Sequence, residues 1–276
     1  MLFNLVNRLS DWLDGIGLYP FVQVLNQLEF RAFVAVILSF ALVIIFGKRI
    51  IRWLVSQKIS DSPEFYNEDL NRLMESRAHT PTMGGLIICG SVLATVLLFA
   101  DLGERHVHFA LIVLLWLAAV GGADDWLKLT SARRNPGSRE GLYAWEKLVF
   151  QLGIGFLIGI FLYQAAMKPP SPGPLLTLPF QRTYDPGTFT IEEGVIILGP
   201  VAFAIVSILL IAGASNAVNL TDGMDGLAPG TLVIASFAMM VLCYIAGSAD
   251  AARFLMFPHV PAAGELMVVT GAMAGA

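Results

Sequence analysis

Charged residues are scarce in this chain of 276 residues. Asp, Glu, Lys and Arg make up 14% of it, against about 25% in ordinary soluble domains, while hydrophobic residues make up 56%. This composition excludes an ordinary soluble domain and predicts an all-α protein that crosses a membrane several times. The net charge of −4 also argues against nucleic acid as a partner, because nucleic-acid-binding surfaces are usually basic.

Two further absences limit the chemistry. The chain has only two cysteines, Cys89 and Cys243, and both lie in apolar runs. They predict buried small side chains and no disulfide framework. The sequence also shows no Ser/His or Cys/His arrangement of the kind that supports nucleophilic catalysis.

Long apolar runs take the place of the missing charge. A bilayer span needs about 20 apolar residues, and the chain offers six complete candidates and one incomplete one. They are Phe30–Phe46, Gly84–Ala100, Phe109–Ala123, Leu148–Met167, Val195–Ala214, Leu227–Ala246 and a seventh from about Ala262. The seventh runs into Ala276. We therefore expect one integral-membrane domain, residues 1–276, that is truncated at its C-terminus.

Basic residues predict how these spans are oriented. The first and third connections between spans carry eleven Lys and Arg residues, the fifth carries none, and the opposite face carries six. Because Lys and Arg favour the cytoplasmic side of a membrane, the odd-numbered connections are predicted to be cytoplasmic and the N-terminus to be outside.

A regular series of polar side chains separates the fifth and sixth spans. It consists of Asn216, Asn219, Asp222 and Asp225. A spacing of three residues drifts by about 60° per step around an α-helix. The four side chains can therefore converge only if the helix ends or bends among them, which Gly223 and Gly226 permit. The alternative is a plain polar loop. We favour a ligand site, because a loop beside a membrane usually carries Lys or Arg.

Two adjacent carboxylates, Asp124 and Asp125, end the third span. If the helix continues, Lys128 lies on nearly the same face as both. One interpretation is a helix-end ion pair between Asp125 and Lys128. We favour a site for Mg²⁺ and phosphate with the lysine as counter-charge, because the second pair of carboxylates is predicted on the same side of the membrane.

Other candidates are weaker when taken alone. Thr80 or Thr82 could cap the second span, and the N-terminus of that helix would suit an anion. Lys147 opens the fourth span, where a lysine is common anyway. Together the carboxylates, amides and lysines predict Mg²⁺-assisted phosphoryl transfer. A cation transporter would instead carry its acidic residues inside the spans, whose interiors lack them here.

Three stretches carry a resemblance to a known family: Thr80–Gly85, Asp124–Lys128 and Asn216–Leu227. They resemble the signatures of phospho-N-acetylmuramoyl-pentapeptide transferases, in the polyprenyl-phosphate N-acetylhexosamine-1-phosphate transferase superfamily. The resemblance implies Mg²⁺-dependent transfer of phospho-MurNAc-pentapeptide from UDP-MurNAc-pentapeptide to undecaprenyl phosphate. The products would be lipid I and UMP, in peptidoglycan synthesis. It also implies a homodimer in the bacterial plasma membrane, with a cytoplasmic active site.

The resemblance also assigns roles by position. Those it implies to be catalytic are Asp124, Asp125, Asp222 and Asp225. The implied Mg²⁺ ligands among them are Asp124, Asp125 and Asp225. Those implied to bind substrate are Lys128, Lys147, Asn216, Asn219, Thr80, Thr82 and Arg77. We expect Asp124 to be the base toward the lipid phosphate. Base and metal ligand, and a one-step and a two-step mechanism, remain alternatives.

The chain departs from the family pattern in two places. Lys-x-Gly usually precedes Thr-Pro-Thr in the family, whereas this chain has Arg77-Ala78-His79. The family also has about ten spans, with a third aspartate and a histidine cluster beyond the seventh. Two alternatives to the main hypothesis are kept. One is a GlcNAc-1-phosphate transferase of the same superfamily, and the other is a non-catalytic membrane scaffold or transporter.

Overall fold

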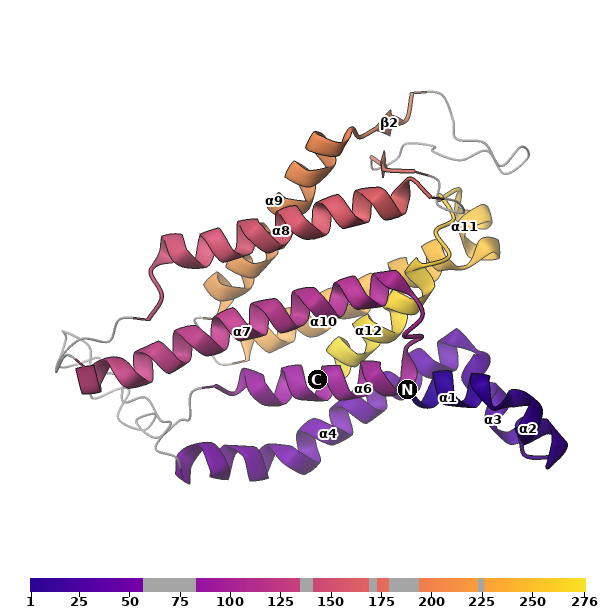
Figure 1. Cartoon of the computed structure of the whole chain (residues 1–276), viewed down its shortest axis with the longest axis horizontal. Helices are drawn as coiled ribbons and strands as arrows, with labels where there is room; N and C mark the ends of the chain where they lie inside the picture. The colour runs from indigo at the N-terminus through magenta and orange to yellow at the C-terminus, as the bar shows by residue number, and fades with distance from the viewer. Residues whose placement is uncertain (57–82, 135–140, 169–172, 179–193, 223–225) are drawn as a thin grey trace.

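The computed structural model describes residues 1–56, 83–134, 141–168, 173–178, 194–222 and 226–276, and they are almost entirely helical (Figure 1). Short helices come first: α1 (Leu2–Arg8), α2 (Ser10–Gly15), α3 (Tyr19–Val22) and the 3₁₀ turn η1 (Gln23–Asn26). The main helices are α4 (Leu28–Ser56), α6 (Gly85–Phe99), α7 (Arg105–Arg134), α8 (Ala144–Ala166), α9 (Pro200–Thr221), α10 (Leu227–Gly247) and α12 (Ala263–Gly275). The short α11 (Ala249–Leu255) precedes α12. Two-residue strands, β1 (Leu175–Leu176) and β2 (Ile196–Ile197), pair antiparallel.

The prediction of an all-α polytopic membrane protein is confirmed. Within the described residues, five helices are long and apolar enough to span a membrane: α4, α7 as far as Thr130, α8, α9 and α10. The apolar helices α6 and α12 are shorter, with 15 and 13 residues. Every expected span thus overlaps a helix, but the fifth, expected at Val195–Ala214, is displaced: α9 runs from Pro200 to Thr221, because Ile196–Ile197 pair as strand β2 and Pro200 favours the first turn of a helix. The number of complete spans and the orientation stay predictions.

Two further helices extend well beyond the expected spans. The first span was expected to end at Phe46, but α4 continues to Ser56; the third was expected to end at Ala123, but α7 continues to Arg134. Hydropathy marks where a chain leaves the lipid, whereas backbone hydrogen bonds decide where a helix ends. The extension of α7 matters most, because it keeps Asp124, Asp125 and Lys128 on one helix.

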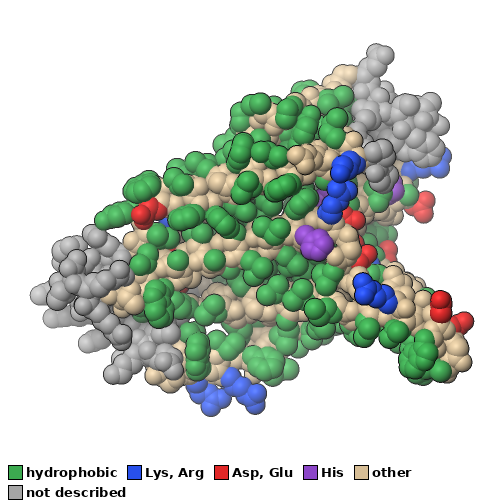
Figure 2. Space-filling model, in the orientation of Figure 1, with side chains coloured by type: hydrophobic (Ala, Val, Ile, Leu, Met, Phe, Trp, Pro, Cys, Tyr) green, Lys and Arg blue, Asp and Glu red, His purple; other side chains and the backbone are tan. Residues whose placement is uncertain are grey.

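The outer surface is suited to lipid. Large apolar side chains project outward along the long helices, for example Val201 at 72% exposure and Ile234 at 72%. In Figure 2 hydrophobic side chains cover most of the visible face, and charged ones gather toward its ends. Such exposure would promote aggregation in water but is favourable against acyl chains.

Small residues allow the helices to approach closely. Gly271 and Gly275 of α12 lie against the backbone carbonyls of Ala32 and Val36 in α4, where any Cβ would clash. Gly155 of α8 similarly faces the backbone of Ile208 in α9. Close approach of this kind is the usual basis of helix association in membranes. Figure 1 shows α8 and α9 on one side of α7, and α4 and α6 on the other.

A buried ion pair connects the helices at the end of the molecule where α4 and α12 begin. Arg31 is 3% exposed, and its Nη1 and Nη2 donate to the two carboxylate oxygens of Glu265 at 2.8 and 2.6 Å. Nη1 also donates to the Phe99 carbonyl at 3.0 Å, and the guanidinium lies 3.9 Å from the Phe3 ring centroid. The Asp101 N–H donates to Glu265 at 2.9 Å. We call these five residues the Arg31 cluster.

Candidate functional site

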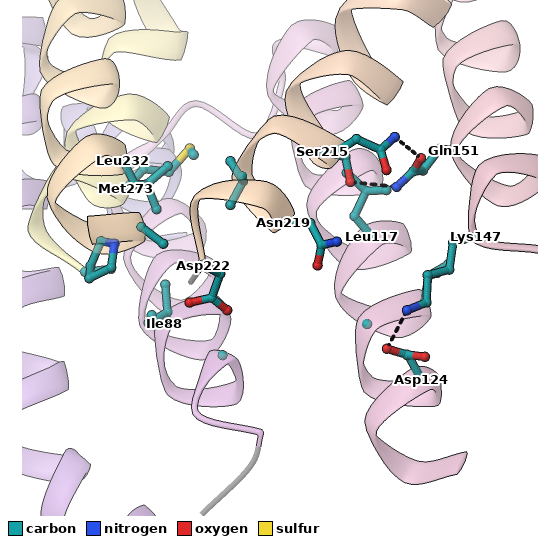
Figure 3. A pocket seen from close by; sticks show the side chains of 18 of the residues that line it. Ile88, Leu117, Asp124, Lys147, Gln151, Ser215, Asn219, Asp222, Leu232 and Met273 are labelled. Atoms are coloured by element: carbon teal, nitrogen blue, oxygen red, sulfur yellow. Dashed lines mark hydrogen bonds and ion pairs between the residues drawn. The ribbon is translucent and has the colours of Figure 1, made fainter. Parts of the chain in front are cut away.

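A cavity of about 550 Å³ opens at the other end of the bundle (Figure 3). Helices α6, α7, α8, α9, α10 and α12 all contribute to its wall. We call it the polar cavity, after the polar side chains that line it: Asp124, Lys147, Gln151, Ser215, Asn216, Asn219 and Asp222. Residues far apart in sequence, from the third, fourth and fifth expected spans, therefore meet at one place.

Asp124 is the most buried carboxylate of this cavity, with 7% exposure. Because α7 continues past it, Lys128 lies one turn further along, with Nζ 2.8 Å from Asp124 Oδ2. The same Nζ is 4.0 Å from Asp125 Oδ1. Lys128 therefore pairs more closely with Asp124 than with Asp125, the partner proposed in the simpler interpretation of this motif.

A second lysine reaches Asp124 from the next helix. Lys147 Nζ lies 2.8 Å from the same Oδ2 atom. Lys147 belongs to the first turns of α8, where the Glu146 carboxylate accepts the Tyr143 N–H at 2.8 Å and so fixes the start of the helix. One carboxylate thus faces two ammonium groups, and because Lys128 also bonds it, Lys147 can turn toward an anion such as phosphate without leaving Asp124 unpaired.

The backbone before α8 completes the surroundings of Asp124. The Leu142 N–H donates to Asp124 Oδ1 at 2.8 Å. At Gly141 a Cβ would overlap Asp124 Oδ1 and would crowd the Lys128 side chain at 3.0 Å. Only glycine lets the backbone pass so close to the carboxylate. Sequence reasoning missed both residues, because nothing in residues 141–142 marks them as neighbours of α7.

The end of α9 supplies the other wall. Asn216 and Asn219 lie in its last turns, and Asp222 follows directly after Thr221, where the helix ends. Beyond the gap, Gly226 takes φ +80° before α10 begins, a conformation that favours glycine. The helix does end within the polar series, as convergence requires. Figure 3 shows Asp222 on one side of the cavity, Asp124 and Lys147 on the other, and Asn219 between them.

The remaining predicted site residues do not line the polar cavity or lie outside the described residues. Asp125 and Lys128 adjoin Asp124 on α7 but do not line the cavity. Asp225, Arg77, Thr80 and Thr82 lie outside the described residues. Their predicted roles stay predictions, as do those of the residues that line the cavity.

A hydrogen-bonded chain in the wall was not predicted. The amide of Gln151, in α8, accepts from Asn216 Nδ2 at 2.7 Å and donates to Ser215 Oγ at 3.0 Å. Gln151 is 7% exposed. A signal for it existed: Gln151 stands four positions after Lys147, so the two share one face of α8 in an otherwise apolar run.

The oxygen atoms that line the polar cavity suit a Mg²⁺ ion that keeps part of its water shell. Mg²⁺ takes oxygen ligands and often only one or two carboxylates, with water and substrate phosphates completing its shell. Asp222 is exposed and lines the cavity together with Asn219. Both Asp124 oxygens are already bonded within the protein. In the described part of the chain no three His, Cys, Asp or Glu side chains converge. The residues therefore fit a partly hydrated Mg²⁺ near Asp222 better than a closed cage at Asp124.

An apolar cavity of about 610 Å³ adjoins the polar one. Its wall is almost wholly hydrophobic, with Val92, Leu111, Ile158 and Val269 among its residues. Leu117 and Met273 line both cavities. A ligand with a polar head and an apolar chain would match this pair of spaces.

Comparisons with known proteins agree with this geometry. Residues 107–268 match the family described as Glycosyl transferase family 4. Over 276 residues the chain is 36% identical to the phospho-N-acetylmuramoyl-pentapeptide-transferase of Thermodesulfovibrio yellowstonii, covering 100% of this chain and 69% of that protein. The matched family segment contains Asp124, Lys147 and Asn216, which are residues of the polar cavity.

Proposed function

The chain belongs to the phospho-N-acetylmuramoyl-pentapeptide transferases, within glycosyl transferase family 4, and is thus a membrane transferase. On this basis we propose the complete reaction that the protein catalyses. The protein transfers phospho-MurNAc-pentapeptide from UDP-MurNAc-pentapeptide to undecaprenyl phosphate. The reaction requires Mg²⁺ and yields lipid I and UMP. The proposal places the protein in the bacterial inner membrane, as a homodimer, with its site on the cytoplasmic face. The homodimer rests on family membership alone.

One observation carries the proposal: a buried carboxylate, Asp124, pairs with two lysines, and one of them, Lys147, lines the polar cavity with it. Both substrates are anionic, and bringing their phosphates together costs free energy unless cations compensate. Lys147, the lysine that lines the cavity, is placed to receive a phosphate oxygen. Positioning and charge compensation are the main protein contributions to phosphoryl transfer.

The contacts of Asp124 change the role we assign to it. A carboxylate that accepts from two ammonium groups and one N–H is stabilised as an anion and is a weak base. We therefore assign to Asp124 the orientation of Lys128 and Lys147, in place of the base role expected from the sequence. Asp222 is the candidate Mg²⁺ ligand within the cavity, while the roles of Asp125 and Asp225 as Mg²⁺ ligands stay predictions from the sequence. Bound Mg²⁺ would neutralise charge developing on the diphosphate.

The neighbouring apolar cavity supports a lipid acceptor. An isoprenoid phosphate must keep its chain in apolar surroundings while its head group reaches the lysines. The two cavities share Leu117 and Met273, so head and chain can occupy them together. Binding of the chain outside the polar cavity also leaves room for the nucleotide beside Asn219 and Asp222.

The cytoplasmic placement has its own support. Lys48, Arg49 and Arg52 lie toward the C-terminal end of α4, which packs against α6. The start of α6, at Gly85, lines the polar cavity. The basic end of α4 therefore belongs to the same side as the site, and basic residues favour the cytoplasmic side.

The test is UMP release by the purified chain in detergent, from UDP-MurNAc-pentapeptide and undecaprenyl phosphate. We expect release with Mg²⁺, loss of release with EDTA, and recovery when excess Mg²⁺ is added back. UDP-GlcNAc serves as the matched donor, and faster release from it would favour the GlcNAc-1-phosphate alternative. Absence of release from both donors at every Mg²⁺ concentration would contradict the proposal.

A further inference from the structure

The amide of Asn216 has a defined orientation in the wall of the polar cavity. Its Nδ2 donates to the Ala212 carbonyl at 2.8 Å and to Gln151 Oε1 at 2.7 Å. A backbone carbonyl can only accept, so the atom that faces Ala212 has to be the nitrogen. Both hydrogens of the amide are thereby used inside the protein.

The remaining bonding capacity of Asn216 is that of an acceptor. With Nδ2 committed to Ala212 and Gln151, the atom with bonding capacity left for a ligand is Oδ1. An amide oxygen repels phosphate oxygens and attracts hydroxyl or N–H groups. Asn216 would present the opposite polarity if its amide were turned over.

Gln151 is the residue that holds this polarity from the neighbouring helix. Because it meets a donor at Asn216, its own Oε1 faces Asn216 and its Nε2 faces Ser215, to which it donates at 3.0 Å. Figure 3 shows Gln151 reaching from α8 to Ser215 at the end of α9. Gln151 is 7% exposed, so solvent competes little with these bonds.

We propose that Gln151 is a positioning residue for the nucleotide sugar: it fixes the Asn216 amide so that Asn216 selects a hydrogen-bond donor on that substrate. The donor is a hydroxyl or an imide N–H. The phosphates are left to Lys147, which lines the cavity one turn before Gln151 on α8. This inference rests on the proposed function, because it needs a nucleotide sugar in the polar cavity.

The experiment is a double-mutant cycle in which calorimetry measures the binding of UDP-MurNAc-pentapeptide to the purified chain in detergent. The variants are Gln151→Met, Asn216→Ala and the two combined. Gln151→Met keeps the length of the side chain and removes both hydrogen bonds. We expect it to weaken binding by about three- to tenfold, as for the loss of one well-placed hydrogen bond. In the Asn216→Ala background the same change should have almost no effect.

A matched control separates positioning from packing. Ser207→Ala alters another polar side chain in the interface of α8 and α9, where Ser207 lies against Gly159 and donates to its own helix at the Phe203 carbonyl. It should leave binding unchanged. In turnover, Gln151→Met should raise KM for the nucleotide sugar and leave both kcat and KM for the lipid phosphate within about twofold.

Three results would overturn the inference. The first is that Gln151→Met weakens binding equally in the wild-type and Asn216→Ala backgrounds. The second is that Ser207→Ala weakens binding to a similar extent. The third is that Gln151→Met also raises KM for the lipid phosphate in parallel. If thermal unfolding shows that Gln151→Met does not fold, Ser215→Ala replaces it. That variant keeps the Asn216 bond and should weaken binding about twofold, again only when Asn216 is present. Wild-type protein that neither binds the nucleotide sugar nor releases UMP would overturn the proposed function and this inference together, whereas active wild type without coupling overturns the inference alone.

Discussion

The two ends of the bundle each hold an ion pair on a buried charged side chain, Arg31 and Asp124, but they differ in how far the partners are covered. In the Arg31 cluster one guanidinium meets one carboxylate, both Glu265 oxygens are used, and the Phe3 ring covers the pair. In the polar cavity Asp124 meets two lysines beside an open space. About 30 Å of α7 separates the two places, counted from Arg105 to Asp124 at the helical rise.

This difference teaches which buried ion pair serves chemistry. A balanced pair covered by protein has no charge left to offer, so we expect it to determine stability and the arrangement of helices. At the cavity wall Lys147 can exchange Asp124, which Lys128 also bonds, for a ligand phosphate. Short distances are common to both ends and do not distinguish them, whereas the cations do: Arg31 is buried, and Lys128 and Lys147 are partly exposed.

The largest expected effect comes from Asp124→Asn. The substitution keeps the side-chain shape but removes the charge that orients Lys128 and, at the cavity wall, Lys147. We expect UMP release to fall by about 10²- to 10³-fold, because the orientation of both lysines and the contact with the Leu142 N–H are lost together. Unfolding in detergent should confirm that the protein is folded. Retention of more than half of the activity would show that the two ends do not differ as described.

Glu265→Gln should have the converse effect. It leaves the Arg31 guanidinium buried without its counter-charge, which costs about 3–5 kcal/mol and lowers the Tm by roughly 6–20 °C. Activity per folded molecule should stay near that of the wild type at low temperature. The double variant Arg31→Met with Glu265→Leu is the control, and it should regain part of the lost Tm because no charge is left unpaired. If Glu265→Gln abolishes UMP release while the protein is folded, the Arg31 cluster takes part in function.

Gly141→Ala tests the backbone contact at Asp124 without changing any charge. The new methyl group would overlap Asp124 Oδ1, so the backbone must move and the Leu142 N–H bond is lost. A hydrogen bond to a charged group contributes about 1.5–3 kcal/mol, which predicts a fall in kcat/KM of about ten- to 150-fold. Gly153→Ala in α8 is the control, because a Cβ there meets no atom within 4 Å. Equal activity of the two variants would exclude a role for the 141–142 backbone.

The smallest expected effect separates the two lysines. Lys147→Met removes an ammonium group that lines the cavity and should raise KM for the nucleotide sugar by about tenfold. Lys128 is more exposed, at 49% against 31% for Lys147, and lies outside the cavity wall. Lys128→Met should therefore cost about threefold, with a larger dependence on salt. A reversed order would place the phosphate on the side of Lys128.

Sequence reasoning reached those parts of the site that depend on spacing within one helix. The interval from Asp124 to Lys128 fixes their contact once α7 is known to continue, and the glycines after Asp222 predict the end of α9. It also grouped Asp124, Asn216 and Asp222 on one side of the membrane, because counting spans requires no packing information.

Contacts between helices were beyond sequence reasoning. Lys147 reaches Asp124 across 23 positions, and Glu265 reaches Arg31 across 234. These distances depend on how α8 and α12 are rotated about their axes, which small residues such as Gly271 decide through packing. Gln151 was missed for another reason: a single amide in an apolar run resembles a tolerated polar residue until its partner on α9 is known.

The separation of Arg31 and Glu265 along the chain also has a consequence for the order of synthesis. Arg31 enters the membrane with the first long helix, and Glu265 is translated 234 residues later. At a translation rate of about 5–20 residues per second, roughly 10 to 50 s pass between the synthesis of Arg31 and that of Glu265. The Phe3 ring is made before it and the Phe99 carbonyl soon after, so these two contacts are the partners within the cluster that a nascent chain can offer. Ribosome-bound chains that stop before α12 should therefore be the form of this protein most exposed to membrane quality control.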